Sequence, residues 1–448
     1  MSRERVHLVS LGCPKNRVDS ELMVGQLMEG DFEFVDEAGD AEVIIVNTCS
    51  FIQPATEESI DTVLELARHK AEGCRKLVVT GCMVQRYGEE LVDQFPEVDA
   101  FLGTGDYHRI KDVLEARENR ARQVFIGPPT ALHDEHDPRV NSWTSHSAYL
   151  KISEGCDHTC AFCIIPTMRG KHRSRSIPSL VEEARRLVAG GVRELNLVAQ
   201  DSTAYGRDLE ESGDVGHLLQ ALALLPELSW IRLHYLYPHG VPERLLEVLA
   251  HEEKVCRYVD IPLQHASGPM LKAMKRGVSR SGQEKILSRI RAAVPDVSLR
   301  TTFIVGFPGE TDRDFDELLD FVREQRFDRV GAFLYSQEAG TAAAELPGQV
   351  SEAVMTERLE QLMAVQAEIA LRKHEAIVGK VLPVMIDGAS SESEHLLEGR
   401  LESQAPEVDG KVFLTNPRGG LHPGSIVSAR IVQASEVDLV GDLAISSA

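Results

Sequence analysis

Long hydrophobic runs, cysteines and aromatic residues are all scarce in this sequence. No stretch approaches the roughly 18 consecutive apolar residues of a membrane-spanning helix. The N-terminal MSRERVHLVS starts a strand pattern and lacks the apolar segment of a signal peptide. Eight cysteines in 448 residues are too few for a disulfide scaffold. These absences argue against the membrane and disulfide-rich classes, and they predict a soluble, cytoplasmic protein with reduced thiols and no membrane partner.

Positive charge is also in short supply. The 48 Lys and Arg residues are outnumbered by 70 Asp and Glu residues, which gives a formal net charge of −22. Such a balance argues against a general affinity for the phosphate backbone of nucleic acids. It suits a basic partner better.

Three of the few cysteines form one compact group. Cys156, Cys160 and Cys163 make a C-x-x-x-C-x-x-C run within EGCDHTCAFCIIP. Ferredoxin-type runs and zinc ribbons use two-residue gaps, so the three-residue first gap fits neither. Three thiolates leave one iron of a four-iron cluster open, which suits reaction on a substrate. The alternative is a structural zinc site with His158 or His172 as the fourth ligand.

A second group of three cysteines is dispersed, but each member follows an apolar run that is typical of a strand. VHLVSL at 6–11 precedes Cys13, VIIV at 43–46 precedes Cys49, and LVVT at 77–80 precedes Cys82. Helical patterns separate these runs, which predicts a parallel sheet whose ligands gather at the carboxyl ends of the strands. We therefore expect a second iron–sulfur site there. The first of these helices is expected from Asp19 towards Met28, with Asp19 or Ser20 as its cap.

Two further cysteines, Cys74 and Cys256, have no partner at a matching position. Free cysteine is among the most frequently buried residue types. We expect these two to be ordinary core residues.

The chain as a whole predicts an α/β protein of three domains. These are a doubly wound parallel-sheet domain over 1–126, a linker over 127–146, a partial (β/α)6 barrel over 147–374 and a small all-β barrel over 375–446. A long amphipathic helix is expected near 350–374. The six barrel strands are expected at 148–152, 194–198, 230–235, 258–261, 299–305 and 329–334.

Longer motifs around these cysteines resemble those of a known family. The stretches are GCPKNRVDSE around Cys13, NTC ending at Cys49, GC at Cys82, IPTMRGKHRSR after Cys163 and FIVGFPGET at 303–311. Together with the domain order they resemble the radical S-adenosylmethionine (SAM) methylthiotransferases. That family has an N-terminal cluster domain, a radical SAM domain and a C-terminal TRAM domain.

The resemblance implies two 4Fe-4S clusters and SAM as cofactors. Cys13, Cys49 and Cys82 would hold one cluster, and Cys156, Cys160 and Cys163 the other. SAM would bind the open iron of the second cluster, with Phe162 as a contact, and a flavodoxin or a ferredoxin-like protein would supply electrons.

The family chemistry would proceed in two stages. One SAM would methylate a sulfur on the first cluster, and a second would give the radical that removes hydrogen from the substrate carbon. No catalytic residue beyond the cluster ligands is assigned, because an unactivated C–H bond offers no acidic proton for acid–base catalysis.

Two branches of this family differ in substrate. The MiaB-like branch modifies an adenosine of tRNA, and the RimO branch modifies the β-carbon of an aspartate in small-subunit ribosomal protein S-twelve. IPLQHAS at 261–267, RLHYLYP at 232–238 and RTTF at 300–303 resemble the RimO branch. The tRNA enzyme is the near alternative, and a non-catalytic iron–sulfur carrier is a third.

Local charge supports a protein substrate. Residues 375–448 contain 11 acidic and 5 basic residues, whereas a barrel that grips tRNA should be basic. We therefore expect acids such as Glu402, Glu407 and Asp409 to help dock a basic ribosomal protein, and nucleic acid not to be required for the chemistry. The basic run at 171–175 is expected to form a salt-bridged rim of the central barrel.

Overall fold

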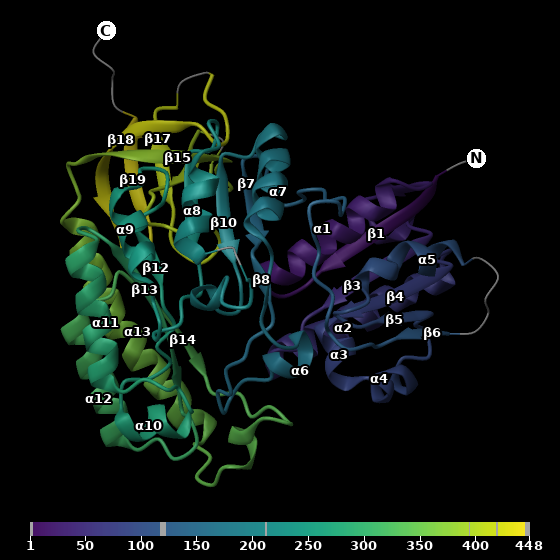
Figure 1. The fold of residues 1–448 in the computed structure, drawn as a ribbon, viewed down its shortest axis with the longest axis horizontal. Coiled ribbons are helices and arrows are strands. Elements are labelled where there is room, and N and C mark those ends of the chain that lie inside the picture. The colour runs from purple at the N-terminus through teal and green to yellow at the C-terminus, as the bar shows by residue number, and fades with distance from the viewer. Residues whose placement is uncertain (1–2, 117–121, 211–212, 394, 418–419, 444–448) are drawn as a thin grey trace.

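A parallel sheet forms the N-terminal part of the protein, seen at the right of Figure 1. The computed structural model describes residues 3–116, 122–210, 213–393, 395–417 and 420–443. The six strands lie in the order β2-β1-β3-β4-β5-β6, and every neighbouring pair is parallel. They are β1 (Glu4–Ser10), β2 (Phe32–Phe34), β3 (Val43–Thr48), β4 (Lys76–Gly81), β5 (Ala100–Leu102) and β6 (Gln123–Phe125).

Helices cover both faces of this sheet, as the predicted doubly wound fold requires. The five are α1 (Pro14–Met28), α2 (Gln53–Ala67), α3 (Cys82–Tyr87), α4 (Glu89–Gln94) and α5 (Ile110–Glu115). Apolar residues of α1 and α5 pack on one face, and those of α2, α3 and α4 pack on the other. Because β1 lies between β2 and β3, the strand order reverses there, and ligands of such sheets bind outside that point.

The first helix begins earlier than the sequence pattern predicts. It starts at Pro14, with Cys13 in the extended N-cap position, so the expected cap at Asp19 or Ser20 is wrong. Proline is favoured at the first helical position because its missing N–H would be unbonded there anyway. Asp19 instead lies inside the helix and uses its carboxylate in contacts with the central barrel.

Six parallel strands form the central partial barrel, as predicted. They are β7 (Ser147–Lys151), β10 (Glu194–Val198), β11 (Trp230–Leu233), β12 (Tyr258–Asp260), β13 (Ser298–Val305) and β14 (Arg329–Leu334). They make two three-stranded sheets, β11-β10-β7 and β12-β13-β14. A parallel bridge between Ile231 and Val255 and a hydrogen bond from Cys256 N to Ile231 O (2.9 Å) join the sheets.

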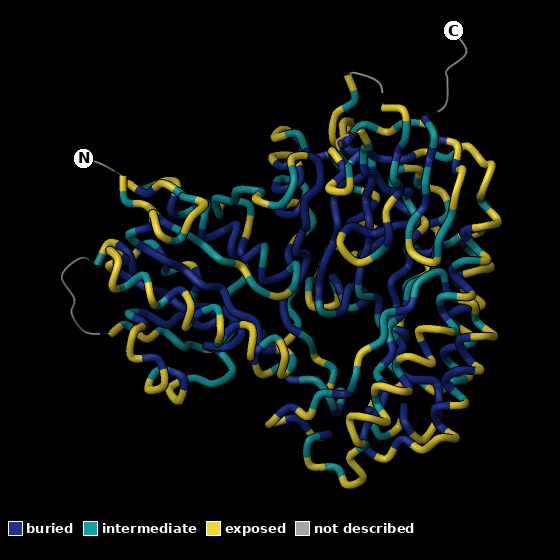
Figure 2. Tube along the Cα trace, turned by 180° about the vertical axis from the view of Figure 1, so that it is seen from behind, coloured by how far each residue is buried: buried dark blue, intermediate teal, exposed yellow. Residues whose placement is uncertain are grey.

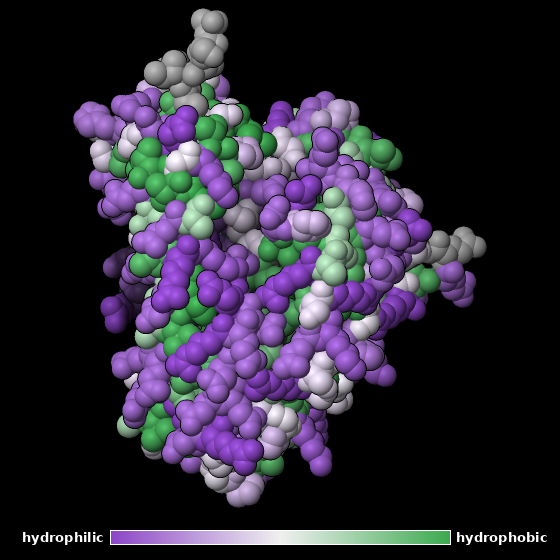
Figure 3. Space-filling view, turned by 90° about the vertical axis from the view of Figure 1, so that its left-hand side faces the viewer, coloured by the Kyte–Doolittle hydropathy of each residue, from purple (hydrophilic) through white to green (hydrophobic). Residues whose placement is uncertain are grey.

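Helices surround these strands and enclose one continuous hydrophobic core. Figure 2 shows the strands buried while the outer sides of the helices are exposed, and Figure 3 shows mainly hydrophilic residues on the helical side. The helices are α6 (Ile165–Arg169), α7 (Ile177–Ala189), α8 (Val215–Ala223), α9 (Glu243–His251), α10 (Gly268–Ala273), α11 (Arg280–Ala293), α12 (Asp312–Gln325) and α13 (Glu352–Glu375). None of the helices described is long and apolar enough to cross a membrane.

The C-terminal strands close into the predicted small barrel. The strands β15 (Val381–Ala389), β16 (Leu397–Arg400), β17 (Val412–Thr415), β18 (Ile426–Ala434) and β19 (Leu439–Leu443) form it in the order β15-β16-β17-β19-β18. It contacts the amino-terminal ends of the central strands, where Arg400 reaches Glu194 and Arg232 donates to Glu402 O (2.6 Å). This barrel therefore lies at the end of the central strands opposite their carboxyl ends.

Two of the acids expected to dock a substrate make contacts within the chain. The Asp409 side chain is 1% exposed and accepts a hydrogen bond from Tyr258 OH (2.9 Å). Glu407 accepts hydrogen bonds from Trp143 Nε1 (2.9 Å) and Tyr149 OH (3.0 Å). The docking role predicted for Asp409 is wrong, because its carboxylate is buried. The Glu407 side chain is 43% exposed, so its docking role stays a prediction.

The segment between the N-terminal sheet and the central barrel is held by buried ion pairs. Arg139 binds Glu21 of α1 (2.6 Å) and Glu183 of α7. His133 packs beside Arg175, and burial together with that cation lowers the pKa of His133 to about 4. The segment thus fixes the N-terminal sheet to the barrel.

Removing the main anchor of the C-terminal barrel should destabilise the protein. Arg400 and Arg232 hold the fully buried Glu194; burial alone would raise the pKa of this carboxyl, but the two guanidiniums lower it. Arg400→Met leaves Glu194 partly uncompensated, and we expect a loss of about 3–5 kcal/mol of stability. Thermal unfolding measures it. The control is Arg372→Met, since that side chain is 66% exposed; equal melting temperatures for the two variants would contradict the interpretation.

Candidate active site

Cys13, Cys49 and Cys82 lie at the carboxyl ends of three adjacent strands. Each follows the end of its strand, β1, β3 or β4, within three residues. The register places Ser10 opposite Asn47 and Asn47 opposite Thr80, so the three strands end side by side. The structure therefore brings this cysteine triad to one edge of the sheet, which we call the sheet triad.

Glycines allow these cysteine loops to pack closely. Gly12 has φ +85°, and a Cβ built there would lie 2.7 Å from Cys49 Sγ. Gly81 has φ +98°, and a Cβ there would lie 2.3 Å from Asn47 Oδ1. Both the left-handed backbone and the lack of space exclude other residues. The loop of Cys13 thus rests directly on the Cys49 side chain.

The compact group, here called the loop triad, lies between β8 (Ser153–Glu154) and α6. Cys156 N donates to Gly170 O (3.0 Å), and Cys163 N donates to Cys160 O (3.1 Å), which folds the loop back on itself. All three cysteine side chains are half-buried. Phe162 is also half-buried and packs on the apolar cluster that contains Met270, Met274 and Phe307.

The two triads adjoin each other across the domain boundary. Cys82 of the sheet triad packs against Ile164 and Met168, and Ile164 directly follows Cys163. Arg169, at the end of α6, donates a hydrogen bond from Nη2 to Cys82 Sγ at 3.4 Å. One short helix therefore connects the loop triad to a thiol of the sheet triad.

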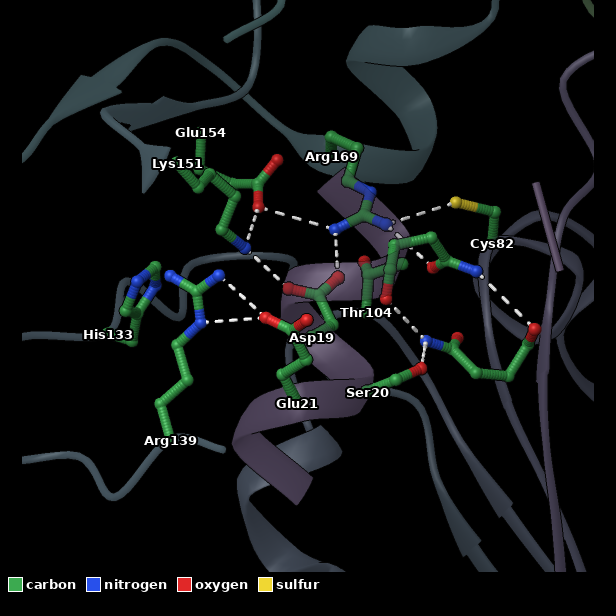
Figure 4. A network of polar contacts seen from close by, with 12 residues as sticks. Asp19, Ser20, Glu21, Cys82, Thr104, His133, Arg139, Lys151, Glu154 and Arg169 are labelled. Atoms are coloured by element: carbon green, nitrogen blue, oxygen red, sulfur yellow. Dashed lines mark hydrogen bonds and ion pairs between the residues drawn. The ribbon is translucent and has the colours of Figure 1, made fainter. Parts of the chain in front are cut away.

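A buried ion network surrounds Arg169 (Figure 4). Its guanidinium binds Asp19 (2.6 Å) of α1 and Glu154 (3.3 Å) of β8. Lys151 binds the same two carboxylates, Asp19 at 2.5 Å and Glu154 at 2.8 Å. Two cations thus share two anions, and all four side chains are at most 6% exposed.

The loop triad has its own cationic and aromatic neighbours. Arg276 donates from Nη1 to Cys160 Sγ at 3.3 Å and lies over the ring of Tyr237. His158 stacks on the same Tyr237 ring, with the two ring centroids 3.7 Å apart. These contacts form a polar wall beside the loop triad.

The zinc alternative finds no support in this arrangement. His158 Nε2 hydrogen-bonds Asp201 (2.7 Å), and His172 Nε2 hydrogen-bonds Ser174 Oγ (3.0 Å), so these two ring nitrogens are engaged elsewhere. Within the described part of the chain, no three His, Cys, Asp or Glu side chains are gathered as for a single metal ion. Of the basic run at 171–175, Arg175 pairs with Glu183.

The thiols of both triads fit iron–sulfur clusters chemically. Burial raises the pKa of Cys82 to about 12, that of Cys156 to about 11 and that of Cys163 to about 12. Such thiols keep their protons at neutral pH unless a metal cation replaces them. Each triad offers three thiols, and one guanidinium donates to a sulfur of each. Hydrogen bonds to sulfur are a usual feature of cluster sites.

Polar atoms without partners at the carboxyl ends of the central strands fit a polar ligand. Buried polar groups are normally hydrogen-bonded, so each such atom requires an explanation. Among the described residues, atoms without a hydrogen bond beyond these strand ends include Ser153 Oγ, Gln200 Oε1 and Tyr335 OH. His265 Nε2 and Glu310 Oε1 also lack a hydrogen bond and lie 3.6 Å from each other. This end of the barrel can therefore take a ligand with several hydrogen-bonding groups, such as SAM.

Sequence reasoning missed the cations of this site. Arg169 lies in IPTMRGKHRSR and Lys15 in GCPKNRVDSE, both of which were noted as motifs only. Their positions next to cysteine motifs were the available signal. Cys74 and Cys256 are buried at 4% and 1% exposure, as expected of core residues.

Comparison with protein families divides the chain into three parts. The model of the family described as "Uncharacterized protein family UPF0004" matches residues 5–103, that of the radical SAM superfamily matches 150–322, and that of the TRAM domain matches 378–444. The sheet triad lies in the first part and the loop triad in the second.

Curated relatives match nearly the whole chain. Ribosomal protein uS12 methylthiotransferase RimO of Geobacter sulfurreducens is 48% identical over 99% of this chain and 99% of its own length. The protein of the same name from Anaeromyxobacter sp. strain K is 50% identical over 98% of this chain and 92% of its own.

Solved structures show the same fold at low identity. The radical S-adenosylmethionine methyltransferase TsrM of Kitasatospora setae has a TM-score of 0.55 at 14% identity, over 87% of this chain and 79% of that one. The cobalamin-dependent S-adenosylmethionine radical enzyme OxsB has a TM-score of 0.51 at 13% identity, over 81% and 56%. This likeness concerns the fold alone.

Replacing Arg169 should loosen the boundary between the two triads. Arg169→Met leaves Asp19 and Glu154 with Lys151 as their shared cation, and we expect a loss of about 3–5 kcal/mol because a buried charge loses its partner. Urea unfolding measures it. Arg185→Met is the control, since its side chain is 59% exposed. An unchanged urea midpoint for Arg169→Met would show that the network contributes no stability.

Proposed function

The chain belongs to the RimO family of radical SAM methylthiotransferases, and from this premise we propose that it adds a methylthio group to the β-carbon of an aspartate in ribosomal protein uS12. The observation that carries the proposal is the meeting of two cysteine triads at one domain boundary. Such a pair suits a reaction in which one centre carries sulfur and the other starts radical chemistry.

As a member of this family the chain uses SAM and 4Fe-4S clusters. We propose that Cys13, Cys49 and Cys82 hold one cluster, and that the loop triad of Cys156, Cys160 and Cys163 holds the other. When bound, these groups supply the methylthio group and the radical chemistry that exchanges a C–H bond for a C–S bond. The grouping of three thiols at each site and the guanidiniums that donate to a sulfur of each triad support this assignment.

The residues around the triads orient the reactants and limit access of water. Arg169 and Lys151 keep the sheet triad against α6, and Met168 and Ile164 seal Cys82 with apolar contacts. Phe162 supports the cysteine loop from the apolar side, and we propose that it contacts SAM. No side chain is assigned a proton-transfer step.

The partners and boundaries follow the same proposal. A flavodoxin or a ferredoxin-like protein would supply electrons to the loop triad, whose cysteines are half-buried. The reaction would take place in the cytoplasm, where ribosomal proteins are found, and nucleic acid is not required for it. The domain boundaries near 126, 147 and 375 are supported by the ends of β6, the start of β7 and the end of α13.

The two triads should have separable functions. Replacing Cys156, Cys160 and Cys163 with Ala should abolish reductive cleavage of SAM and lower the iron content by about half, because each triad supplies all protein ligands of one cluster. Replacing Cys13, Cys49 and Cys82 should leave SAM cleavage measurable and stop methylthio transfer. Iron analysis and quantification of deoxyadenosine measure this. Full iron and full product from the second triple variant would contradict the assignment.

The identity of the substrate is tested by the mass that the modification adds. Ribosomal proteins and tRNA nucleosides from cells with and without this chain are compared by mass spectrometry. We expect a gain of about 46 Da on an aspartate-containing peptide of uS12, as a methylthio group replaces hydrogen. Loss of methylthioadenosine from tRNA, with that peptide unchanged, would instead assign the chain to tRNA modification. No deoxyadenosine from the anaerobically reconstituted protein would leave only an iron–sulfur carrier.

A further inference from the structure

One buried lysine reaches from the sheet triad to the central barrel. Lys15 follows Cys13 by two residues in the first turn of α1 and is 9% exposed. Its Nζ lies 3.4 Å from Ala199 O and 3.7 Å above the centre of the Tyr235 ring. Ala199 directly follows β10, and Tyr235 comes two residues after β11. The ammonium therefore lies at the carboxyl end of the barrel, where the loop triad also lies.

This ammonium has no anionic partner within the described residues. A lysine is almost never fully buried unless it is paired, and its three donors need acceptors. Lys151, in the same interface, is held between two carboxylates. Lys15 has one long hydrogen bond to a carbonyl and the face of an aromatic ring. Most of its capacity to bind an anion is thus unused.

The groups around Lys15 are already committed to other contacts. The carboxylate of Asp260 lies beside Tyr235. It is paired with Arg300 at 3.0 Å and accepts a hydrogen bond from Tyr235 N at 3.2 Å. Tyr235 has φ +61°, a conformation unusual for an aromatic residue. Backbone strain of this kind persists where the surroundings enforce it, often at ligand sites. The strained residue presents its ring beneath the ammonium.

We propose that Lys15 binds the carboxylate of the substrate aspartate and thereby determines specificity for it. The inference rests on the proposed function and names the group that recognises its substrate. A charged ammonium–carboxylate hydrogen bond has a length of about 2.7–2.9 Å. The β-carbon is bonded directly to the carboxylate carbon, so this contact holds the reacting carbon beside the boundary of the two triads.

The unpaired cation also predicts that neutral analogues of the substrate are rejected. An asparagine at the target position, or an adenosine, brings no negative charge and leaves the buried ammonium uncompensated. Sites with a polar group that must be paired discriminate strongly against ligands that lack the partner. Lys15 belongs to the N-terminal sheet and is close in sequence to the sheet triad, whereas the loop triad lies in the barrel. This placement favours the carboxylate of the substrate over that of SAM as the anion bound.

The test compares two substrates and three variants. The substrates are purified uS12 with the target aspartate and uS12 with asparagine at that position. The variants are Lys15→Met, which removes the charge at similar length, Lys15→Arg, which keeps it, and Lys76→Met. Lys76 is the matched control because it is equally buried, at 9% exposure, and bonds to Val113 O. Binding of each substrate, product formation, SAM cleavage and iron content are measured on the reconstituted holoenzyme.

We expect Lys15→Met to bind aspartate-containing uS12 roughly 10- to 100-fold more weakly, from the usual strength of a hydrogen bond to a charged group. Its affinity for the asparagine form should be unchanged, so the discrimination between the two disappears. Lys15→Arg should retain most of the discrimination between the two substrates, and Lys76→Met should retain all of this discrimination. SAM cleavage without uS12 and iron content should match those of the natural protein.

Other outcomes overturn this inference in distinguishable ways. A raised KM for SAM with unchanged affinity for uS12 would assign Lys15 to the SAM carboxylate. A lowered iron content with unchanged discrimination would assign it to the sheet triad. If the natural protein modifies uS12 and Lys15→Met discriminates equally well, Lys15 binds no substrate carboxylate. If the natural protein modifies no uS12 at all, the proposed function itself fails.

Discussion

The buried ion network of Asp19, Lys151, Glu154 and Arg169 determines how the two cysteine triads meet. Taking charges out of water is costly, and attraction between them repays that cost only when geometry and pairing are good. Two cations sharing two anions satisfy this condition in one arrangement of the N-terminal sheet on the barrel. A shift of either domain would leave buried charges unpaired. The network thus specifies one relative position, which brings Cys82 against the helix that follows the loop triad.

Much of the fold could be predicted from sequence because local rules determine it. Parallel strands end at one edge, so three cysteines that follow apolar runs had to be neighbours, and the register of β1, β3 and β4 places them so. The bounds of the barrel strands were predicted to within two residues, because local sequence patterns determine them too. Asp19 was misassigned as a helix cap, because an acid near the start of a helical pattern is typical of a cap. Its actual partners, Lys151 and Arg169, lie more than a hundred residues away, and no local pattern shows them.

Charge illustrates the same limit at the C-terminal barrel. The acidic composition of residues 375–448 suggested a docking surface, yet several of these acids face other parts of the chain. Asp387 helps to hold Arg400, and Glu407 contacts Trp143 and Tyr149 near the N-terminal sheet. A count of charges tells neither how deeply each acidic side chain is buried nor which way it points. This barrel contacts the ends of the central strands that lie opposite the triads.

The boundary between the N-terminal sheet and the barrel contains two kinds of buried cation. One kind stabilises the docked domains, and the other is available to bind a ligand. Arg169 and Lys151 are neutralised by carboxylates of the chain, so they stabilise the docked domains whether or not a ligand is present. Lys15 lies at the same boundary with an aromatic face and one carbonyl as its contacts. An incompletely paired charge costs stability, and such a cost is retained where binding of a ligand removes it. The anion that pairs with the Lys15 ammonium must reach the boundary between the triads. The reacting carbon must lie there too.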